Sequence, residues 1–249
     1  MTTQTNLLRS EFRKLTTTRM PIGFVVVLIA LAVLNGVAVV LGTDMDGSKS
    51  FISTADDQQS LMAFAANALT ITGLFGAIAA AREYAHLTVI AAYLAEPRRG
   101  RGLRAQFIAI AMAGGVLGLL GTGLTIVAVA MTLPTTDYAF LASAGGVTQV
   151  LLASAWAGAA GAVLGASIGN VVRNTGGAVT GAVLALVIAP PLIVQLASGT
   201  EQWLPTPLAN TVSGITSDTS VVAAGVAMAL WALIPALVAA AVVRRRDVV

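Results

Sequence analysis

The sequence nearest to a catalytic motif in this chain is Gly165-Ala-Ser167-Ile-Gly169, which has the spacing of a nucleophile elbow. That motif needs a strand–turn–helix context, and here it lies inside a long apolar segment. A serine nucleophile also needs a base within hydrogen-bonding reach, and the single histidine, His86, lies in a distant arginine-rich segment. Because Gly161, Gly165 and Gly169 recur every four residues, close packing against another helix is the better interpretation. We therefore expect no catalytic residue, which argues against an intramembrane serine protease.

Nucleotide and metal chemistry lack the residues that they need. The chain has two lysines, Lys14 and Lys49, and neither follows a glycine as the Walker A signature requires. There is no cysteine, and no cluster of histidine and acidic residues has metal-ligand spacing. We expect no cofactor or metal on this chain; if it uses ATP energy, another polypeptide must hold ATP and Mg²⁺.

The remaining candidate for chemistry is an arginine-rich segment at residues 82–104. Its five arginines, Arg82, Arg98, Arg99, Arg101 and Arg104, stand out in a chain that is only 10% charged. Between them, the apolar stretch Leu87–Leu94 is long enough for about two helical turns. We interpret the segment as a cytoplasmic loop whose short helix contacts a partner protein. The alternative is that the arginines only fix the orientation of the chain in the membrane.

The elements that must position this loop are membrane spans. The chain has 249 residues, of which 57% are apolar, whereas a soluble domain carries about 25% charged residues. Several continuous apolar runs reach the roughly 20 residues that cross a bilayer, so we predict an all-α, polytopic protein with one transmembrane domain over residues 1–249. The six predicted spans are Ile22–Leu41, Leu61–Ala81, Ala105–Met131, Val147–Asn170, Gly177–Ala197 and Val221–Val243.

The distribution of charge predicts the orientation of these spans. If both termini are cytoplasmic, Lys49 is the only basic residue on the outer side, and the outer segments hold most of the acidic residues. Enrichment of Lys and Arg on the cytoplasmic side is a strong topology signal. The net charge of +3 therefore reflects membrane orientation, and we expect the lipid bilayer, not nucleic acid, as a partner.

The first twenty residues predict a helix that lies in the membrane interface over residues 6–20. Leu7, Leu8, Phe12 and Leu15 share one helical face, and Arg9, Arg13 and Lys14 lie on the other. The alternative is an ordinary basic flank that only sets topology.

The segment 199–218 is predicted to be extracellular, and it is too short and too interrupted by Pro205 and Pro207 to span a membrane. It is either a surface loop with an interfacial Trp203 or a re-entrant pair of half-helices.

Four mildly polar residues inside the spans are candidates for a substrate path: Asn35, Asn67, Thr70 and Gln195. Hydrogen bonding between helices is the alternative explanation for such residues. The spans contain no ionisable residue of the kind that proton- or sodium-coupled transporters use, which makes a secondary transporter a weaker hypothesis. Pro190-Pro191 should kink or widen the fifth span.

The layout as a whole resembles the permease subunits of ABC-2-type transporters (type V fold), particularly small actinobacterial members. The resemblance rests on the N-terminal run Leu7–Leu15, on Arg82-Glu83-Tyr84 at the end of span two, on Pro97-Arg98-Arg99 before span three, and on six spans with both ends inside. The chain departs from the family at Ala85 and Leu87, where a basic residue and a glycine are usual.

The resemblance implies a permease subunit of an ATP-driven exporter in a bacterial inner (plasma) membrane. Two copies of a cytoplasmic ABC ATPase subunit would bind a permease homodimer through the 82–104 loop, which acts as the coupling helix. The residues expected to carry docking and coupling are Glu83, Tyr84, Thr88, Arg98, Arg99 and Arg101. The apolar spans favour a hydrophobic or amphiphilic cargo, such as a drug, lipid or peptide. The alternative is a non-transporting scaffold or sensor subunit that recruits a cytoplasmic partner through the same loop.

Overall fold

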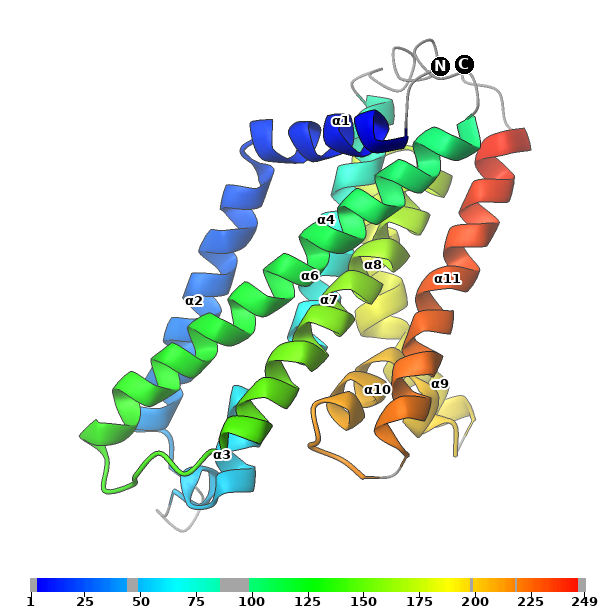
Figure 1. The fold of residues 1–249 in the computed structure, drawn as a ribbon. Coiled ribbons are helices and arrows are strands. Elements are labelled where there is room, and N and C mark those ends of the chain that lie inside the picture. The colour runs from blue at the N-terminus through cyan, green and yellow to red at the C-terminus, as the bar shows by residue number, and fades with distance from the viewer. Residues whose placement is uncertain (1–3, 44–48, 86–98, 198, 218, 246–249) are drawn as a thin grey trace.

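The computed structural model describes residues 4–43, 49–85, 99–197, 199–217 and 219–245, and in this part of the chain every regular element is a helix (Figure 1). The prediction of an all-α chain is therefore confirmed. The helices are α1 Gln4–Thr17, α2 Met20–Leu41, η1 Ser50–Ile52, α3 Ala55–Met62, α4 Ala65–Ala85, α6 Arg99–Thr132, η2 Leu133–Thr135, α7 Ala144–Val172, α8 Thr175–Val183, η3 Leu184–Ile188, α9 Ala189–Leu196, η4 Glu201–Trp203, α10 Pro205–Val212 and α11 Val221–Arg245.

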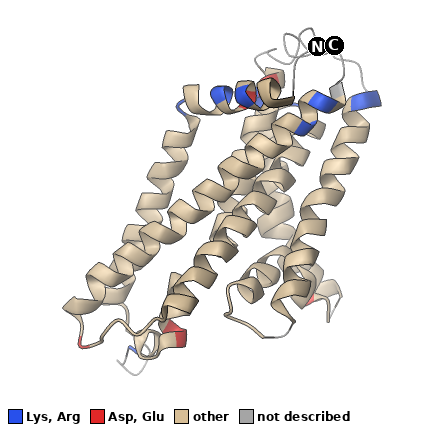
Figure 2. Ribbon diagram, viewed as in Figure 1, with Lys and Arg blue, Asp and Glu red and all other residues tan. Residues whose placement is uncertain are grey.

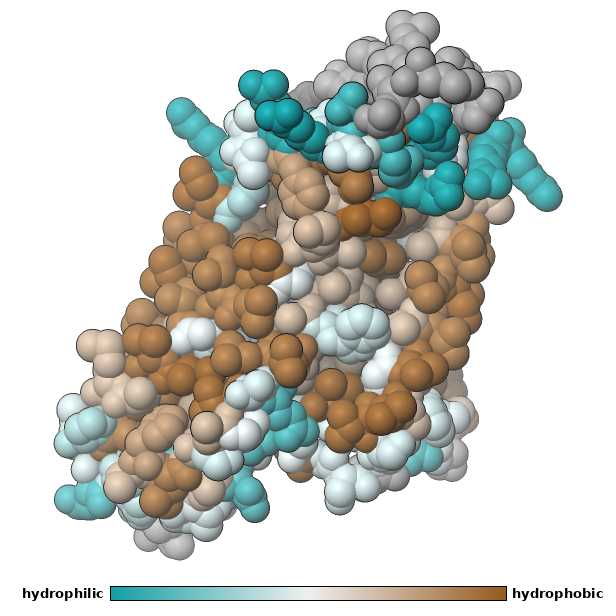
Figure 3. Space-filling view, in the orientation of Figure 1, coloured by the Kyte–Doolittle hydropathy of each residue, from teal (hydrophilic) through white to brown (hydrophobic). Residues whose placement is uncertain are grey.

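Six helical segments of the described chain are long and apolar enough to cross a membrane, as predicted. They are Met20–Leu41, Ala55–Ala85, Gly100–Thr135, Ala144–Val172, Thr175–Leu196 and Val221–Arg245. Figure 3 shows their apolar side chains as a band between two more hydrophilic ends. The face that the helices present outward is rich in large aliphatic side chains. This surface is typical of a chain surrounded by lipid rather than water.

The second span differs from its prediction because it is broken. Helix α3 ends at Met62, Ala63 has an extended backbone, and α4 begins at Ala65. Helix α3 starts at a capping box, in which the Asp57 N–H donates to Thr54 Oγ1 and the Thr54 N–H donates to the Asp57 carboxylate. An averaged hydropathy pattern does not register a break of two residues, because Ala63 and Phe64 are themselves apolar.

Helix α7 is the centre of the bundle, because α4 and α6 both pack against its backbone. A Cβ on Gly165 would lie 1.8 Å from the carbonyl oxygen of Gly73 in α4. A Cβ on Gly118 of α6 would lie 2.1 Å from the carbonyl oxygen of Ser154 in α7. Only glycine permits these approaches, and the predicted packing role of Gly161, Gly165 and Gly169 is confirmed.

Ser167 belongs to this same packed helix. It is buried in α7, and its hydroxyl donates to the Val163 carbonyl at 2.7 Å. The residue is therefore in the middle of a regular helix and not on the strand-to-helix turn that a nucleophile elbow requires.

The fifth span changes its helical form just before the proline pair. Residues Leu184–Ile188 form a π-helical turn, closed by the Ala189 N–H, which donates to the Leu184 carbonyl. Pro190 and Pro191 follow in the first turn of α9. Because proline lacks an N–H and crowds the preceding turn, a widened turn accommodates the pair without ending the span. The predicted widening is confirmed.

Charges divide the molecule into two ends (Figure 2). We call the end that carries α1, the start of α6 and the C-terminal end of α11 the basic end, and the opposite one the acidic end. The basic end holds Arg9, Arg13, Lys14, Arg19, Arg82, Arg101, Arg104, Arg173, Arg244 and Arg245; the acidic end holds Asp56, Asp57, Asp137 and Glu201. Lys49, at the acidic end, donates to the Val39 and Val40 carbonyls and so caps the C-terminus of α2.

Candidate functional site

Helix α1 lies across the basic end of the bundle rather than along it (Figure 1). Its residues Arg9 and Arg13 are exposed, and Leu15 packs among the side chains of the bundle. These positions agree with the predicted amphipathic helix, which begins at Gln4 and ends at Thr17. Lys14 differs from its prediction, because it faces inward, toward α4, instead of outward with Arg9 and Arg13.

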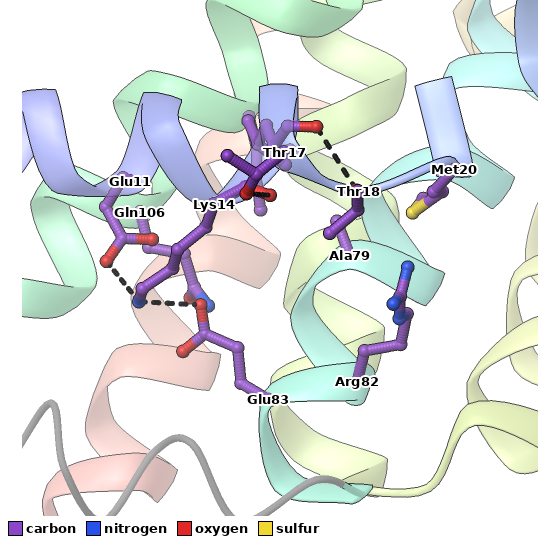
Figure 4. A pocket seen from close by; sticks show the side chains of 11 residues that line it. Glu11, Lys14, Thr17, Thr18, Met20, Ala79, Arg82, Glu83 and Gln106 are labelled. Carbon is purple, nitrogen blue, oxygen red and sulfur yellow. Dashed lines mark hydrogen bonds and ion pairs between the residues drawn. The ribbon is translucent and has the colours of Figure 1, made fainter. Parts of the chain in front are cut away.

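Three charged side chains join α1 to the end of α4 (Figure 4). The Lys14 ammonium forms an ion pair with Glu11, one turn earlier in α1. It also donates to Glu83 of α4 at 3.1 Å. The side chains of Glu11 and Glu83 are only 13% and 16% exposed. We call Glu11, Lys14 and Glu83 the α1 cluster. It places two largely buried carboxylates around one partly exposed ammonium, between α1 and α4.

The composition of the α1 cluster changes the pKa values of Glu11 and Lys14. Burial raises the pKa of the Glu11 carboxyl from 4.5 to about 7; the Glu83 charge adds to the rise and Lys14 opposes it. Burial lowers the pKa of Lys14, but the charges of Glu83 and Glu11 outweigh it, so that this pKa lies above its ordinary value. The lysine is therefore charged at neutral pH, whereas Glu11 titrates there.

A cavity of about 270 Å³ lies beside the α1 cluster, between α1, the start of α2, α4 and α6. Its polar wall includes Arg82 and Gln106, and its apolar wall includes Leu15, Met20 and Ile110. Figure 4 shows Arg82 and Glu83 leaving α4 in different directions, so that Arg82 does not join the ion pairs. The cavity keeps the cluster open to water from one side.

The next residue along α4 begins a second polar network, which is uncharged. The Tyr84 hydroxyl donates to Asn170 Oδ1 of α7 at 3.2 Å, and Asn170 Nδ2 donates to Gln106 Oε1 of α6 at 3.0 Å. Asn170 and Gln106 are buried. The guanidinium of Arg173 lies 5.1 Å from the centre of the Tyr84 ring, on its face. Residues 83 and 84 thus connect the end of α4 to α1, α6 and α7.

At the acidic end, α10 is packed into the bundle and is not a surface loop. Leu204, Pro205, Leu208 and Ala209 are buried against neighbouring helices. The last turn of α10 is held by two glutamines: Gln59 Nε2 donates to the Ser213 carbonyl and Gln149 Nε2 donates to the Val212 carbonyl. Part of the predicted segment 199–218 is thus a short packed helix, and its entry into the membrane stays a prediction.

Two of the four candidate substrate-path residues lie together. Asn67 and Thr70 line a cavity of about 570 Å³ between α2, α4, η3, α9 and α10, which we call the α4–α9 groove. Its other walls include Pro190, Pro191 and Leu204. The groove combines three polar side chains, those of Asn67, Thr70 and Thr206, with a mainly aliphatic lining.

Asn35 and Gln195 do not line this groove in the described structure. Asn35 Nδ2 donates to the Leu31 carbonyl in the preceding turn of α2, and Gln195 is exposed on α9. The structure therefore does not bring these two residues together with Asn67 and Thr70.

The predicted docking loop is shorter than residues 82–104. Helix α4 continues to Ala85 and α6 begins at Arg99, so Arg82, Arg99, Arg101 and Arg104 belong to helices. The glycines at 100 and 102 do not prevent α6 from starting at Arg99, since glycine only weakens a helix. His86, Thr88, Arg98 and the predicted helix Leu87–Leu94 lie outside the described residues.

Glu83 and Tyr84 both have partners within the chain, in Lys14 and Asn170. These contacts have no local signal in the sequence, because the paired residues are 69 and 86 positions apart. Only the spacing of Glu11 and Lys14 along one helix was a detectable signal. A comparison with protein-family models finds no match, and a comparison with curated proteins finds none either.

Proposed function

We propose that this chain is the permease subunit of an ATP-driven ABC exporter, in which a separate ATPase binds the basic end. The observation that carries the proposal is the arrangement at that end. Helix α1 lies across it and is joined through Lys14 to Glu83, two residues before the last residue of α4. A force applied to the chain between α4 and α6 would therefore act on α1 and on three spans together. Transmission of a motion from an ATPase to the spans requires helices that are connected in this way.

The cargo path that we propose is the α4–α9 groove. It lies beside the widened π turn and the proline pair, and its lining is mainly aliphatic, with Asn67, Thr70 and Thr206 as polar contacts. Apolar walls with few polar groups suit a hydrophobic or amphiphilic cargo. A second copy of the permease would close the path from the other side.

The orientation belongs to the same proposal. The basic end faces the cytoplasm, since Lys and Arg accumulate on that side of membrane proteins. The membrane would be the inner membrane of a bacterium, which agrees with the resemblance to ABC-2 permeases. ATP and Mg²⁺ would be bound by the ATPase, and this chain would hold neither.

The test is purification of the tagged full-length chain from its native membrane, followed by identification of the proteins bound to it. The proposal expects an ABC ATPase, and ATP hydrolysis that the permease stimulates in proteoliposomes. Recovery of a kinase or another enzyme in its place would support the scaffold or sensor alternative. Recovery of the chain alone, from membranes that contain the ATPase, would overturn the proposal.

A charge reversal refines the test. Glu83→Lys should reduce the stimulated ATPase activity while the chain still inserts into the membrane, because the reversal removes the contact between α1 and α4. Glu201→Lys is the matched control, since Glu201 is an exposed glutamate at the acidic end. Equal activity of both variants would exclude Glu83 from coupling.

A further inference from the structure

We propose that the α1 cluster is a proton-operated latch, which holds α1 against α4 when Glu11 is protonated and loosens it when Glu11 is ionised. The proposal concerns only contacts within the chain. It therefore does not depend on whether the chain is a transporter.

The geometry of the cluster provides the switch. With Glu11 ionised, two carboxylates that are each less than one-fifth exposed share one ammonium, and the three groups carry a net charge of −1. With Glu11 neutral, Lys14 and Glu83 form a balanced pair at 3.1 Å, and the cluster has no net charge. Two ionised carboxylates close together at a partly buried site are unfavourable, so protonation of Glu11 favours the docked helix.

Few other charged groups line the cavity beside Glu11. Arg82 of α4 lines the cavity but points away from Glu83, and Gln106 of α6, which also lines it, is neutral. The described part of α2 contributes Met20, which does not titrate. On α1 itself, Arg9 and Arg13 lie on the exposed face. Among the described residues that line the cavity, Lys14 forms an ion pair with both carboxylates.

The direction of the pH dependence follows from the pKa of Glu11. Docking raises this pKa from 4.5 to about 7, so the docked helix binds the proton more tightly than the released helix does. The contribution of Glu11 to docking is complete below pH 4.5 and is lost as the pH rises through about 7. Lys14 has a pKa raised above 10.5, so it stays charged in both states over this range.

Cysteine labelling measures the released state, because the chain has no native cysteine. In one variant Leu15→Cys places a thiol in the 270 Å³ cavity, which excludes a polyethylene-glycol maleimide while α1 is docked. In a second variant Ser10→Cys places a thiol on the exposed face of the same helix. The ratio of the two labelling rates removes the intrinsic pH dependence of thiol chemistry.

We expect this ratio to rise roughly ten-fold between pH 6 and pH 8.5, which is the change that one carboxyl with these two pKa values produces. Glu11→Gln, which mimics the protonated side chain, should abolish the rise and keep the ratio at its low-pH value. Glu201→Gln, the same change at the acidic end, should leave the rise intact. A ratio that does not change with pH in the parent chain, or a rise that persists in Glu11→Gln, would overturn the proposal.

Discussion

At the scale of single residues, glycine and asparagine have the most demanding positions in this chain. Gly165 lets two spans meet at backbone distance, and Asn170 satisfies polar groups from two other helices. Neither residue can be replaced by a larger or less polar one without a local rearrangement, because interiors are close-packed and buried polar groups need partners.

Replacing Gly165 by alanine should destabilise the fold by about 1–3 kcal/mol, since the new Cβ would overlap the Gly73 carbonyl and force α4 away from α7. Gly123→Ala is the matched control, because a Cβ there meets no atom within 4 Å. The free energy of unfolding in mixed detergent micelles measures both changes. A neutral Gly165→Ala variant would contradict the close approach of the two helices.

Replacing Asn170 by alanine should cost about 1–3 kcal/mol, because the Tyr84 hydroxyl and the Gln106 side chain each lose a partner. Gln195→Ala removes a comparable amide from an exposed position and should change stability by less than about 0.5 kcal/mol. Thermal unfolding in the same detergent compares the two. If Tyr84→Phe and Asn170→Ala prove additive when they are combined, the network is not a coupled unit.

At the scale of elements, short helices at the two ends of the bundle form side-chain contacts with the long spans. Helix α1 is fixed to the basic end by the α1 cluster, and α10 is fixed to the acidic end by Gln59 and Gln149. Helices this short are unstable on their own, so their contacts decide whether they form.

Loss of both glutamines, in Gln59→Ala with Gln149→Ala, should release the last turn of α10 because its carbonyls lose their side-chain donors. Hydrogen exchange of the α10 amides should then speed up several-fold relative to the parent chain. The α1 amides at the opposite end serve as the internal control and should be unchanged. Equal exchange of α10 in both proteins would show that its apolar contacts alone hold it.

At the scale of the whole molecule, charge is separated between two ends, and this separation predicts the orientation of the chain in a membrane. The basic groups of α1, α4, α6, α7 and α11 gather at one end, although they come from distant parts of the sequence (Figure 2). The apolar band between the two ends fits the hydrocarbon of a bilayer (Figure 3).

The orientation can be read with single cysteines in this cysteine-free chain. Asp137→Cys, at the exposed acidic end, should react with an impermeant maleimide added to intact cells. Arg104→Cys, exposed at the basic end, should react only after the membrane is opened. The reverse pattern would place the basic end outside and remove it as a binding surface for a cytoplasmic ATPase.

The sequence by itself determined the class of the protein, the number of spans and the two charged ends. These features follow from local averages, because a bilayer demands about 20 apolar residues per helix and sorts charges by side. It also determined the glycine spacing on α7, since a repeat of four residues places side chains on one helical face. The inward direction of Lys14 was not predicted, because a basic side chain is typical of the exposed face on which Arg9 and Arg13 lie.

Only the tertiary structure decided which side chains meet. The pairing of Lys14 with Glu83, the contact of Tyr84 with Asn170 and the packing of α10 depend on how each helix is rotated and on which helices are neighbours. The break between α3 and α4, which no helix breaker in the sequence marks, likewise appears only in the structure. Averaged hydropathy does not reveal how an apolar span is rotated, and the α1 cluster exists only because α1 and α4 meet at the basic end of the bundle.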